Sequence, residues 1–124
     1  MSTKPENLYA ALERIFHEPN RLAIMSTLCR MTHGITFSEL KEECDLTDGN
    51  LSRHLKALEE ADAIRIEKTF VKSRPQTTVF ISDKGREQFL EYLKALEEVL
   101  QKAALAMTPE KKPSSIFHGK TSPA

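Results

Sequence analysis

The chain has 124 residues, enough for one domain with a hydrophobic core, and its 40% hydrophobic and 29% charged residues are typical of a globular protein. No apolar run approaches the roughly 18 residues that cross a bilayer, and the N-terminus lacks a signal-peptide core. The 18 basic residues balance 18 acidic ones, so any face that binds a polyanion must be local. Cys29 and Cys44 have no metal-like spacing and are too few for a disulfide framework, so we expect a reducing, cytoplasmic setting.

Two helices are predicted before residue 32. Thr3 and Glu6 fit a capping box that opens a helix to about Phe16. Pro19 suits the first turn of a second helix, which the spacing of apolar residues carries to about Met31.

A glycine and a second capping box mark the next elements. Gly34 breaks the second helix, and Ile35 fits a very short strand. Thr36 with Glu39 forms another capping box and opens a third helix that runs through Cys44.

The fourth helix is predicted in "LTDGNLSRHLKALEEAD", residues 46–62. Thr47 is the expected N-cap, and the short turn 45–47 makes the third and fourth helices a helix-turn-helix. At 100° per residue, Leu51, Leu55 and Leu58 share one face and point into the core. The opposite face carries polar side chains and two cations near its start, and its carboxylates come at the far end, namely Glu59, Glu60 and Asp62.

After Ala63 the apolar period changes from helical to alternating. Residues 64–70 and 77–81 are expected to be strands, joined by the polar segment "VKSRPQ", residues 71–76. This predicts a hairpin whose tip carries Lys72 and Arg74. Ser82 is the expected cap of a long last helix, about 83–107.

The outer face of the fourth helix has side chains that suit the reading of DNA. Asn50 and Ser52 are compact donors and acceptors for base edges, and Arg53 offers a forked donor for guanine. A basic hairpin directly after the helix-turn-helix suits a wing that reaches a minor groove or the phosphate backbone. The residues that we expect to contact double-stranded DNA are Thr47, Asp48, Gly49, Asn50, Ser52, Arg53 and Lys56 on the helix, and Lys72, Ser73, Arg74, Gln76 and Thr77 on the hairpin.

The stretch "LTDGNLSRHLKALEEADAIRIEKTFVKSRPQTTVFISDKGREQF" resembles winged-helix regulators near the ArsR and MarR families. The likeness runs from about residue 18 to 96 and is closest to a small subgroup with "LTDGNLSxHLxxLE", then "K-x-F" and "RPxTxxxxTxxGR". It implies a dimeric prokaryotic transcription regulator with a recognition helix at 47–61 and a wing at 70–78. Asp62 stands where such proteins usually have glycine, and Ser82 stands where threonine is common.

The last helix carries two apolar stripes, one of them with heptad spacing. One domain of this size does not easily cover both, so we expect a homodimer. The expected interface residues are Leu8, Leu12, Ile15, Phe89, Tyr92, Leu93, Leu96, Val99 and Leu100.

The predicted fold is therefore α+β and mostly helical, a winged helix-turn-helix with a hairpin wing and added N- and C-terminal dimerisation helices. Residues 1–107 form the DNA-binding domain, and the proline-containing residues 108–124 form a flexible tail. We expect a sequence-specific regulator that acts as a homodimer on a pseudo-palindromic operator, and repression is the simpler mode for so compact a chain.

The alternatives are a winged helix used only for protein contacts and a metal- or thiol-responsive sensor. Metal-sensing relatives carry two cysteines close together on one helix, whereas "KEECDL" has one. The carboxylates around Cys44 should raise the pKa of its thiol, which disfavours a redox switch. No catalytic motif, cofactor motif or membrane segment is recognisable, so we expect a non-enzyme without a cofactor.

Overall fold

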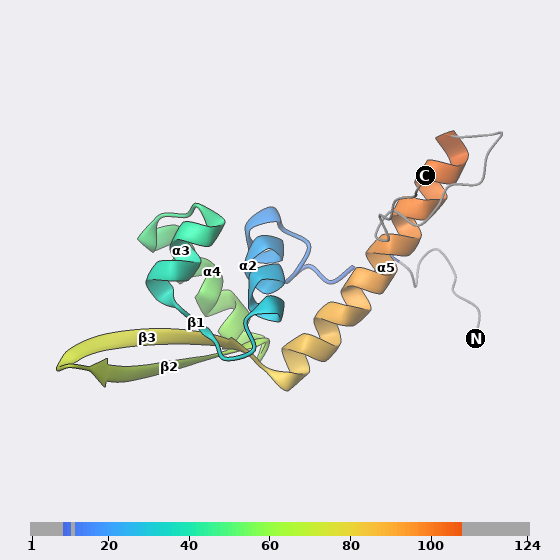
Figure 1. Cartoon of the computed structure of the whole chain (residues 1–124). Helices are drawn as coiled ribbons and strands as arrows, with labels where there is room; N and C mark the ends of the chain where they lie inside the picture. Colours follow the sequence, from blue (N-terminus) through green and yellow to red (C-terminus); the bar gives the residue numbers. More distant parts are fainter. Residues whose placement is uncertain (1–8, 11, 108–124) are drawn as a thin grey trace, which may run out of the picture. The chain divides into compact units, whose positions relative to one another are not determined.

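The computed structural model describes residues 9–10 and 12–107 (Figure 1). The described helices are α2 (Pro19–Arg30), α3 (Phe37–Cys44), α4 (Asp48–Glu60) and α5 (Asp83–Met107). The strands are β1 (Ile35–Thr36), β2 (Ile64–Val71) and β3 (Arg74–Ile81), which form an antiparallel sheet in the order β1-β3-β2. The predicted α+β, mostly helical winged-helix fold is confirmed.

The chain divides into two compact units. Residues 13–89 form one unit, which holds the helix-turn-helix, the sheet and the start of α5. The rest of α5, residues 90–107, belongs to the other unit together with the described residues before 13. The predicted capping box at Thr3 and Glu6, the position of Leu8 and the tail 108–124 lie outside the described residues.

The side-chain caps predicted for the two helices of the helix-turn-helix are present. Thr36 Oγ1 accepts a hydrogen bond from the Glu39 amide at 3.1 Å, and the Glu39 carboxylate accepts one from the Thr36 amide at 3.3 Å. Thr47 Oγ1 accepts from the Asn50 amide at 3.1 Å and starts α4. Between the helices Asp45 adopts φ 55°, the left-handed conformation that often ends a helix. These local contacts fix where α3 ends and α4 begins.

The prediction of a helix that continues to about Phe16 is wrong at its end. Residues 12–18 form bends and turns, and Arg21 Nε donates a hydrogen bond to the Ile15 carbonyl at 2.8 Å. Glu18 is extended (φ −153°, ψ 130°), as expected for the residue before Pro19. Its carboxylate accepts from the Arg21 amide at 2.8 Å and caps α2, which begins at Pro19 as predicted.

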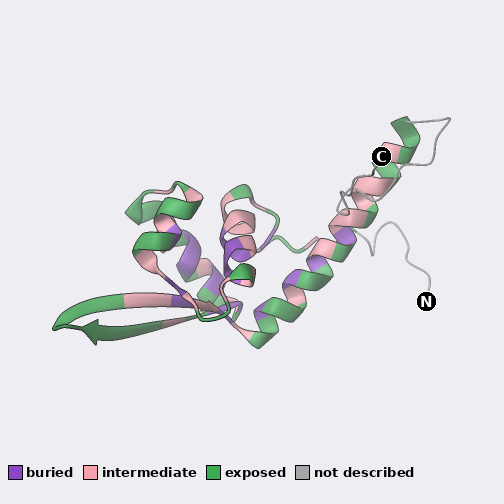
Figure 2. Cartoon of the chain, viewed as in Figure 1, coloured by how far each residue is buried: buried purple, intermediate pink, exposed green. Residues whose placement is uncertain are grey.

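The core of residues 13–89 lies between α2, the helix-turn-helix and the sheet (Figure 2). The predicted inner face of α4 is confirmed, because Leu51, Leu55 and Leu58 are all buried. Phe16 and Phe89 pack edge to face, with ring centroids 5.3 Å apart. The buried apolar side chains of this unit are Phe16, Ile24, Met25, Leu28, Ile35, Leu40, Leu51, Leu55, Leu58, Ala63, Ile64, Val79, Ile81 and Phe89. They hold α4 so that its opposite face is left to solvent.

The hairpin is longer than the sequence predicted. The polar segment 71–76 was expected to be the connecting loop, but Val71 pairs with Arg74, so the turn consists of Lys72 and Ser73 alone. These two residues have φ values of 53° and 68°. Positive φ at both central positions is typical of the type I′ turn, whose twist matches that of the paired strands.

Pro75 lies inside β3, where a proline is unusual. Proline has no N–H to donate to a neighbouring strand and is therefore confined to sheet edges. β1 pairs with β3 only at Thr78 and Val79, so β3 has a single partner, β2, at Pro75. A free edge at that point explains how the strand accommodates the ring.

The hairpin connects to α5 through a tight junction. Ser82 Oγ donates to the Asp62 carbonyl at 2.7 Å and accepts from the Gly85 amide at 2.8 Å, so the predicted cap is confirmed. Asp62 has φ 62°, a conformation that favours glycine and that aspartate tolerates. A Cβ atom on Gly85 would lie 1.9 Å from the Ala63 carbonyl oxygen. Glycine at 85 is therefore required for this close approach.

Candidate nucleic-acid interface

The residues predicted to read DNA from α4 form an exposed surface. The seven positions Thr47, Asp48, Gly49, Asn50, Ser52, Arg53 and Lys56 are all exposed. Arg53 and Lys56 supply its cations, and Ser52 lies one turn before Lys56 on the same side of the helix. Glu59 and Glu60 are also exposed but come at the C-terminal end. The first half of the outer face is thus the part suited to an anionic partner.

One carboxylate lies at the start of this face, but it has a cation beside it. Asp48 is 2.9 Å from the ammonium group of Lys41, which belongs to α3. Because both groups are partly or largely exposed, this pair contributes little to stability. Its effect on the surface is to reduce the negative potential where the first-turn amides of α4 point outward.

Gly49 leaves the first turn of α4 open. A Cβ atom built there meets no other atom within 4 Å. The glycine is therefore not required by packing, in contrast to Gly85. What it provides is space beside the backbone amides, which an approaching phosphate could use.

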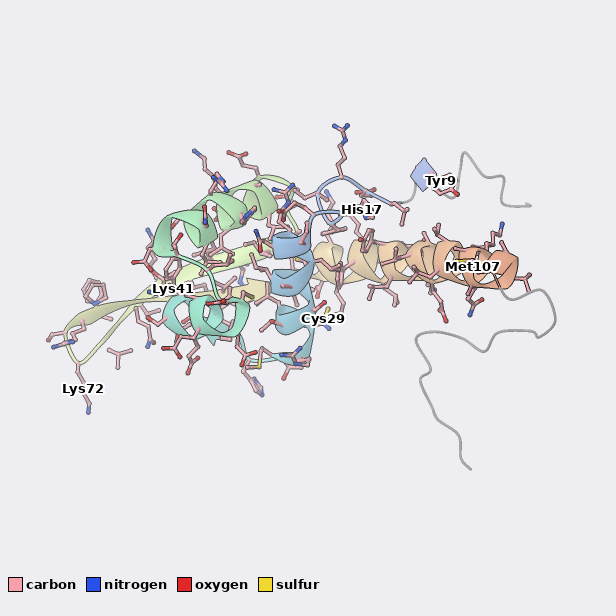
Figure 3. All side chains as sticks on the ribbon, turned by 90° about the horizontal axis from the view of Figure 1, so that it is seen from above. Tyr9, His17, Cys29, Lys41, Lys72 and Met107 are labelled. Carbon is pink, nitrogen blue, oxygen red and sulfur yellow. The ribbon has the colours of Figure 1, made fainter. Side chains whose placement is uncertain are left out.

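The hairpin carries the second group of predicted residues. Lys72, Ser73, Arg74 and Gln76 are exposed, and Thr77 is half-buried. Lys72 lies at the free end of the hairpin, beyond the helices (Figure 3). Arg74 is the first residue of β3 rather than part of a loop, so the paired backbone holds its position.

Two hollows lie between the helix-turn-helix and the hairpin. The smaller, about 240 Å³, is lined by Ser52 and Lys56 of α4 and by Lys68 and Thr77 of the hairpin. Glu59 also lines it and opposes an anion at that end. Both predicted groups of residues thus contribute to one continuous surface.

The larger hollow, about 600 Å³, lies between the start of α3 and the wing. Thr36 and Ser38 line it from one side, and Lys72, Arg74 and Gln76 line it from the other. Ser38 and Lys68 were not among the predicted contact residues. The sequence pattern could have pointed to Lys68, because it is the next residue after Ile66 on the apolar face of β2 and interrupts that face with a charge.

His54 is buried on the inner side of α4. Its Nδ1 lies 3.4 Å from an Arg21 guanidinium nitrogen and 4.0 Å from the Glu18 carboxylate. Its Nε2 is buried and has no hydrogen-bond partner among the described residues. Burial lowers the pKa of His54, Glu18 opposes this shift, and Arg21 and Arg53 add to it. Burial therefore favours the neutral form of the His54 imidazole.

The cysteines lack the surroundings of reactive thiols. Burial raises the pKa of both Cys29 and Cys44, and Glu43 adds to the shift at Cys44. The predicted direction at Cys44 is confirmed, although burial rather than the carboxylates is the main cause. The described residues contain no cluster of three metal-binding side chains and no helix long and apolar enough to cross a membrane.

The predicted dimer residues are distributed unevenly between core and surface. Phe89 and Tyr92 are 1% exposed within a single chain, so a partner has little of their surface left to cover. The remaining described members are half-buried, namely Leu12, Ile15, Leu93, Leu96, Val99 and Leu100. Further along α5, Leu105 and Met107 are 52% and 77% exposed.

The comparison with known families identifies the fold that carries this surface. A family model described as the winged helix DNA-binding domain matches residues 20–100. The chain belongs to this family. The winged helix-turn-helix assignment made from the sequence is confirmed, and the family indicates a DNA-binding transcription regulator rather than an enzyme.

Relatives of this winged-helix chain include archaeal proteins. An uncharacterised protein of Methanocaldococcus jannaschii is 39% identical over 88 residues, which cover 71% of this chain and 91% of that protein. A transcriptional regulator homologue from Pyrococcus horikoshii OT3 is 32% identical, with a TM-score of 0.72 over 79% of this chain and 97% of its own. A Mycobacterium tuberculosis transcriptional regulator, solved in complex with DNA, is 15% identical, with a TM-score of 0.59 over 88% of this chain and 74% of its own. The last likeness concerns the fold alone.

Proposed function

We propose that this protein is a homodimeric transcription regulator that binds a specific pseudo-palindromic duplex and represses transcription by occupying it. The observation that carries the proposal is the outer face of α4, where Asn50, Ser52, Arg53 and Lys56 are exposed ahead of the acidic end. An α-helix fits the major groove, and its N-terminal half is the part that meets base edges in helix-turn-helix proteins. Recognition of a DNA base sequence is the simplest function for this face of α4.

Roles on α4 follow from the chemistry of each side chain. Arg53 donates two hydrogen bonds to guanine, whereas Asn50 and Ser52 are short enough to contact bases near the start of the helix. Lys56 neutralises a phosphate at the periphery. Gly49 allows a phosphate to approach the first-turn amides, which Thr47 caps and Asp48 flanks.

The wing contributes binding that depends less on sequence. Lys72 and Arg74 contact phosphates, and Ser73, Gln76 and Thr77 add hydrogen bonds to the backbone or the minor groove. The relative from Mycobacterium tuberculosis was solved with DNA, which agrees with this use of the fold. Lys56 and Lys68, which line one hollow, would hold a phosphate at the end of that hollow away from Glu59.

Dimerisation through α5 would present two recognition helices to the duplex. Leu93, Leu96, Val99 and Leu100 remain half-buried in one chain, and Leu105 and Met107 are exposed. A second copy that packs along these apolar residues of α5 would cover this surface. Residues 1–107 would then form one DNA-binding and dimerising domain, followed by the tail 108–124.

A duplex selected from a random-sequence pool by the purified protein is the first test. Arg53→Ala should lose discrimination between the selected duplex and a scrambled one by about 1–3 kcal/mol. Lys72→Ala or Arg74→Ala should weaken both complexes alike and reduce the dependence on salt. Failure to enrich any duplex at low salt would contradict the proposal and favour a protein-interaction module.

Dimerisation and repression need separate measurements. Sedimentation should show a dimer at micromolar concentration, and Leu100→Glu should dissociate it while Lys102→Glu should not. A monomeric wild-type protein would contradict this part. Transcription in vitro from a promoter that overlaps the selected duplex should fall when the protein is added, and a rise would mean activation.

A further inference from the structure

The wing has an apolar face that continues past the core. Side chains alternate between the two sides of a strand, so Ile64, Ile66, Lys68 and Phe70 share one face of β2. The strand register places Ile81, Val79, Thr77 and Pro75 opposite them on the same face. At the base of the hairpin, Ile64, Val79 and Ile81 are buried. At its outer end, Phe70 is 75% exposed opposite Pro75.

Packing within the chain does not explain why position 70 is a phenylalanine, because most of its ring is exposed. The outer half of the hairpin is exposed on both strands (Figure 2). A polar β-former such as threonine would serve the strand equally well and would avoid exposing an aromatic surface. The face that carries Phe70 is also the face toward the helix-turn-helix, since Ile66 and Lys68 line a hollow with Ser52 and Lys56 of α4. Phe70 therefore lies on the side of the hairpin where we place the DNA.

The charge around Phe70 fits a polyanion. Residues 68–78 contain three basic side chains, Lys68, Lys72 and Arg74, and no acidic one. None of the three forms an ion pair within the described residues. Two carboxylates lie close to this segment: Glu67 is 3.0 Å from Arg65 on the opposite face of β2, and Glu59 of α4 lines a hollow together with Lys68. Lys68 shares the face of Phe70, Lys72 lies in the turn, and Arg74 lies on the opposite face of the hairpin. An exposed apolar ring on a cationic hairpin suits a ligand whose apolar walls lie between charged rims.

The minor groove of DNA is such a ligand. Its walls are deoxyribose rings with C–H groups on their surface, and its rims are phosphates. Proteins that bind there commonly place apolar side chains against the sugars or between base steps. We propose that Phe70, backed by Pro75, is an apolar contact residue that seats in the minor groove while Lys72 and Arg74 hold the flanking phosphates. This rests on the proposed function and adds to it a contact that is independent of salt.

Replacement of Phe70 by alanine tests the energy of this contact. Because the side chain is exposed in the free protein, Phe70→Ala should fold normally and should weaken binding to the selected duplex by about tenfold or more. The salt dependence should stay unchanged, because an apolar contact releases no counterions. Thr69→Ala is the matched control, since Thr69 is the preceding residue, is exposed, lies on the opposite face of β2 and lines neither hollow. It should bind within about twofold of wild type.

A photo-crosslinking amino acid identifies the occupant directly. A benzophenone side chain in place of Phe70 should cross-link to the duplex, whereas the same group in place of Thr69, on the opposite face of β2, should not. Cross-linking to a second copy of the chain, or a Phe70→Ala variant that binds like wild type, would overturn the inference and leave the proposed function intact. Failure of the wild-type protein to bind any duplex would instead remove the proposed function on which it rests.

Discussion

Replacing Gly49 by alanine should make the protein more stable and a weaker DNA binder. Gly49 is the second residue of α4, and a Cβ atom there meets nothing within 4 Å. Alanine is better than glycine in a helix by up to about 1 kcal/mol, so the free energy of unfolding should rise by several tenths to about 1 kcal/mol. If a phosphate approaches the first-turn amides, the added methyl group would lengthen a charge-assisted hydrogen bond. Its loss costs about 1.5–3 kcal/mol, roughly tenfold or more in affinity.

Gly85→Ala is the matched control for the stability half of this prediction. It brings a similar gain in helix propensity, but its Cβ would lie 1.9 Å from the Ala63 carbonyl oxygen and 2.7 Å from the carbonyl carbon. Both are backbone atoms, so the junction between the hairpin and α5 must shift. We expect a net destabilisation of about 3 kcal/mol, at the upper end of overpacking costs.

Urea unfolding gives the stability change, and fluorescence anisotropy with the selected duplex gives the affinity. A destabilised Gly49→Ala protein would show that the space around Gly49 is not open. A stabilised Gly49→Ala protein that binds like wild type would show that no phosphate comes close to the first turn. Only the combination of higher stability and weaker binding agrees with an open first turn of α4 that a phosphate approaches.

Three further changes test the core and the local geometry. Burial lowers the pKa of His54, so between that lowered pKa and the ordinary value near 6.5 the unfolded chain binds more protons than the native one. The free energy of unfolding should therefore fall as the pH drops from 7 to 5, and urea titrations of His54→Gln should show a flatter pH dependence; an unchanged slope would assign it to other groups. Ser73→Gly should stabilise the protein by up to about 1 kcal/mol, because Ser73 has φ 68°, whereas Gln76→Gly in a strand should destabilise it. Thr36→Ala removes the cap of α3 and should cost about 1 kcal/mol in the same assay, while Thr36→Ser should recover most of the loss.

The sequence determined the helices of the winged-helix unit because their signals are local. A cap and its partner are three residues apart, as in Thr36 and Glu39, so the contact forms wherever the helix forms. The division of α4 into a buried and an outer face also follows from its period of 3.6 residues alone. Ser82 and Pro19 marked the starts of α5 and α2 for the same local reason.

Tertiary structure decided the features that depend on distant partners. The extent of the hairpin depends on pairing across strands, and Pro75 is accepted in β3 only because β1 is too short to reach it. The turns before α2 depend partly on Arg21 reaching back to the Ile15 carbonyl, six residues away. Lys68 joins Lys56 around one hollow only when the sheet packs beside α4. Local spacing determined which side chains each element presents, whereas packing between elements decided which of them share a surface.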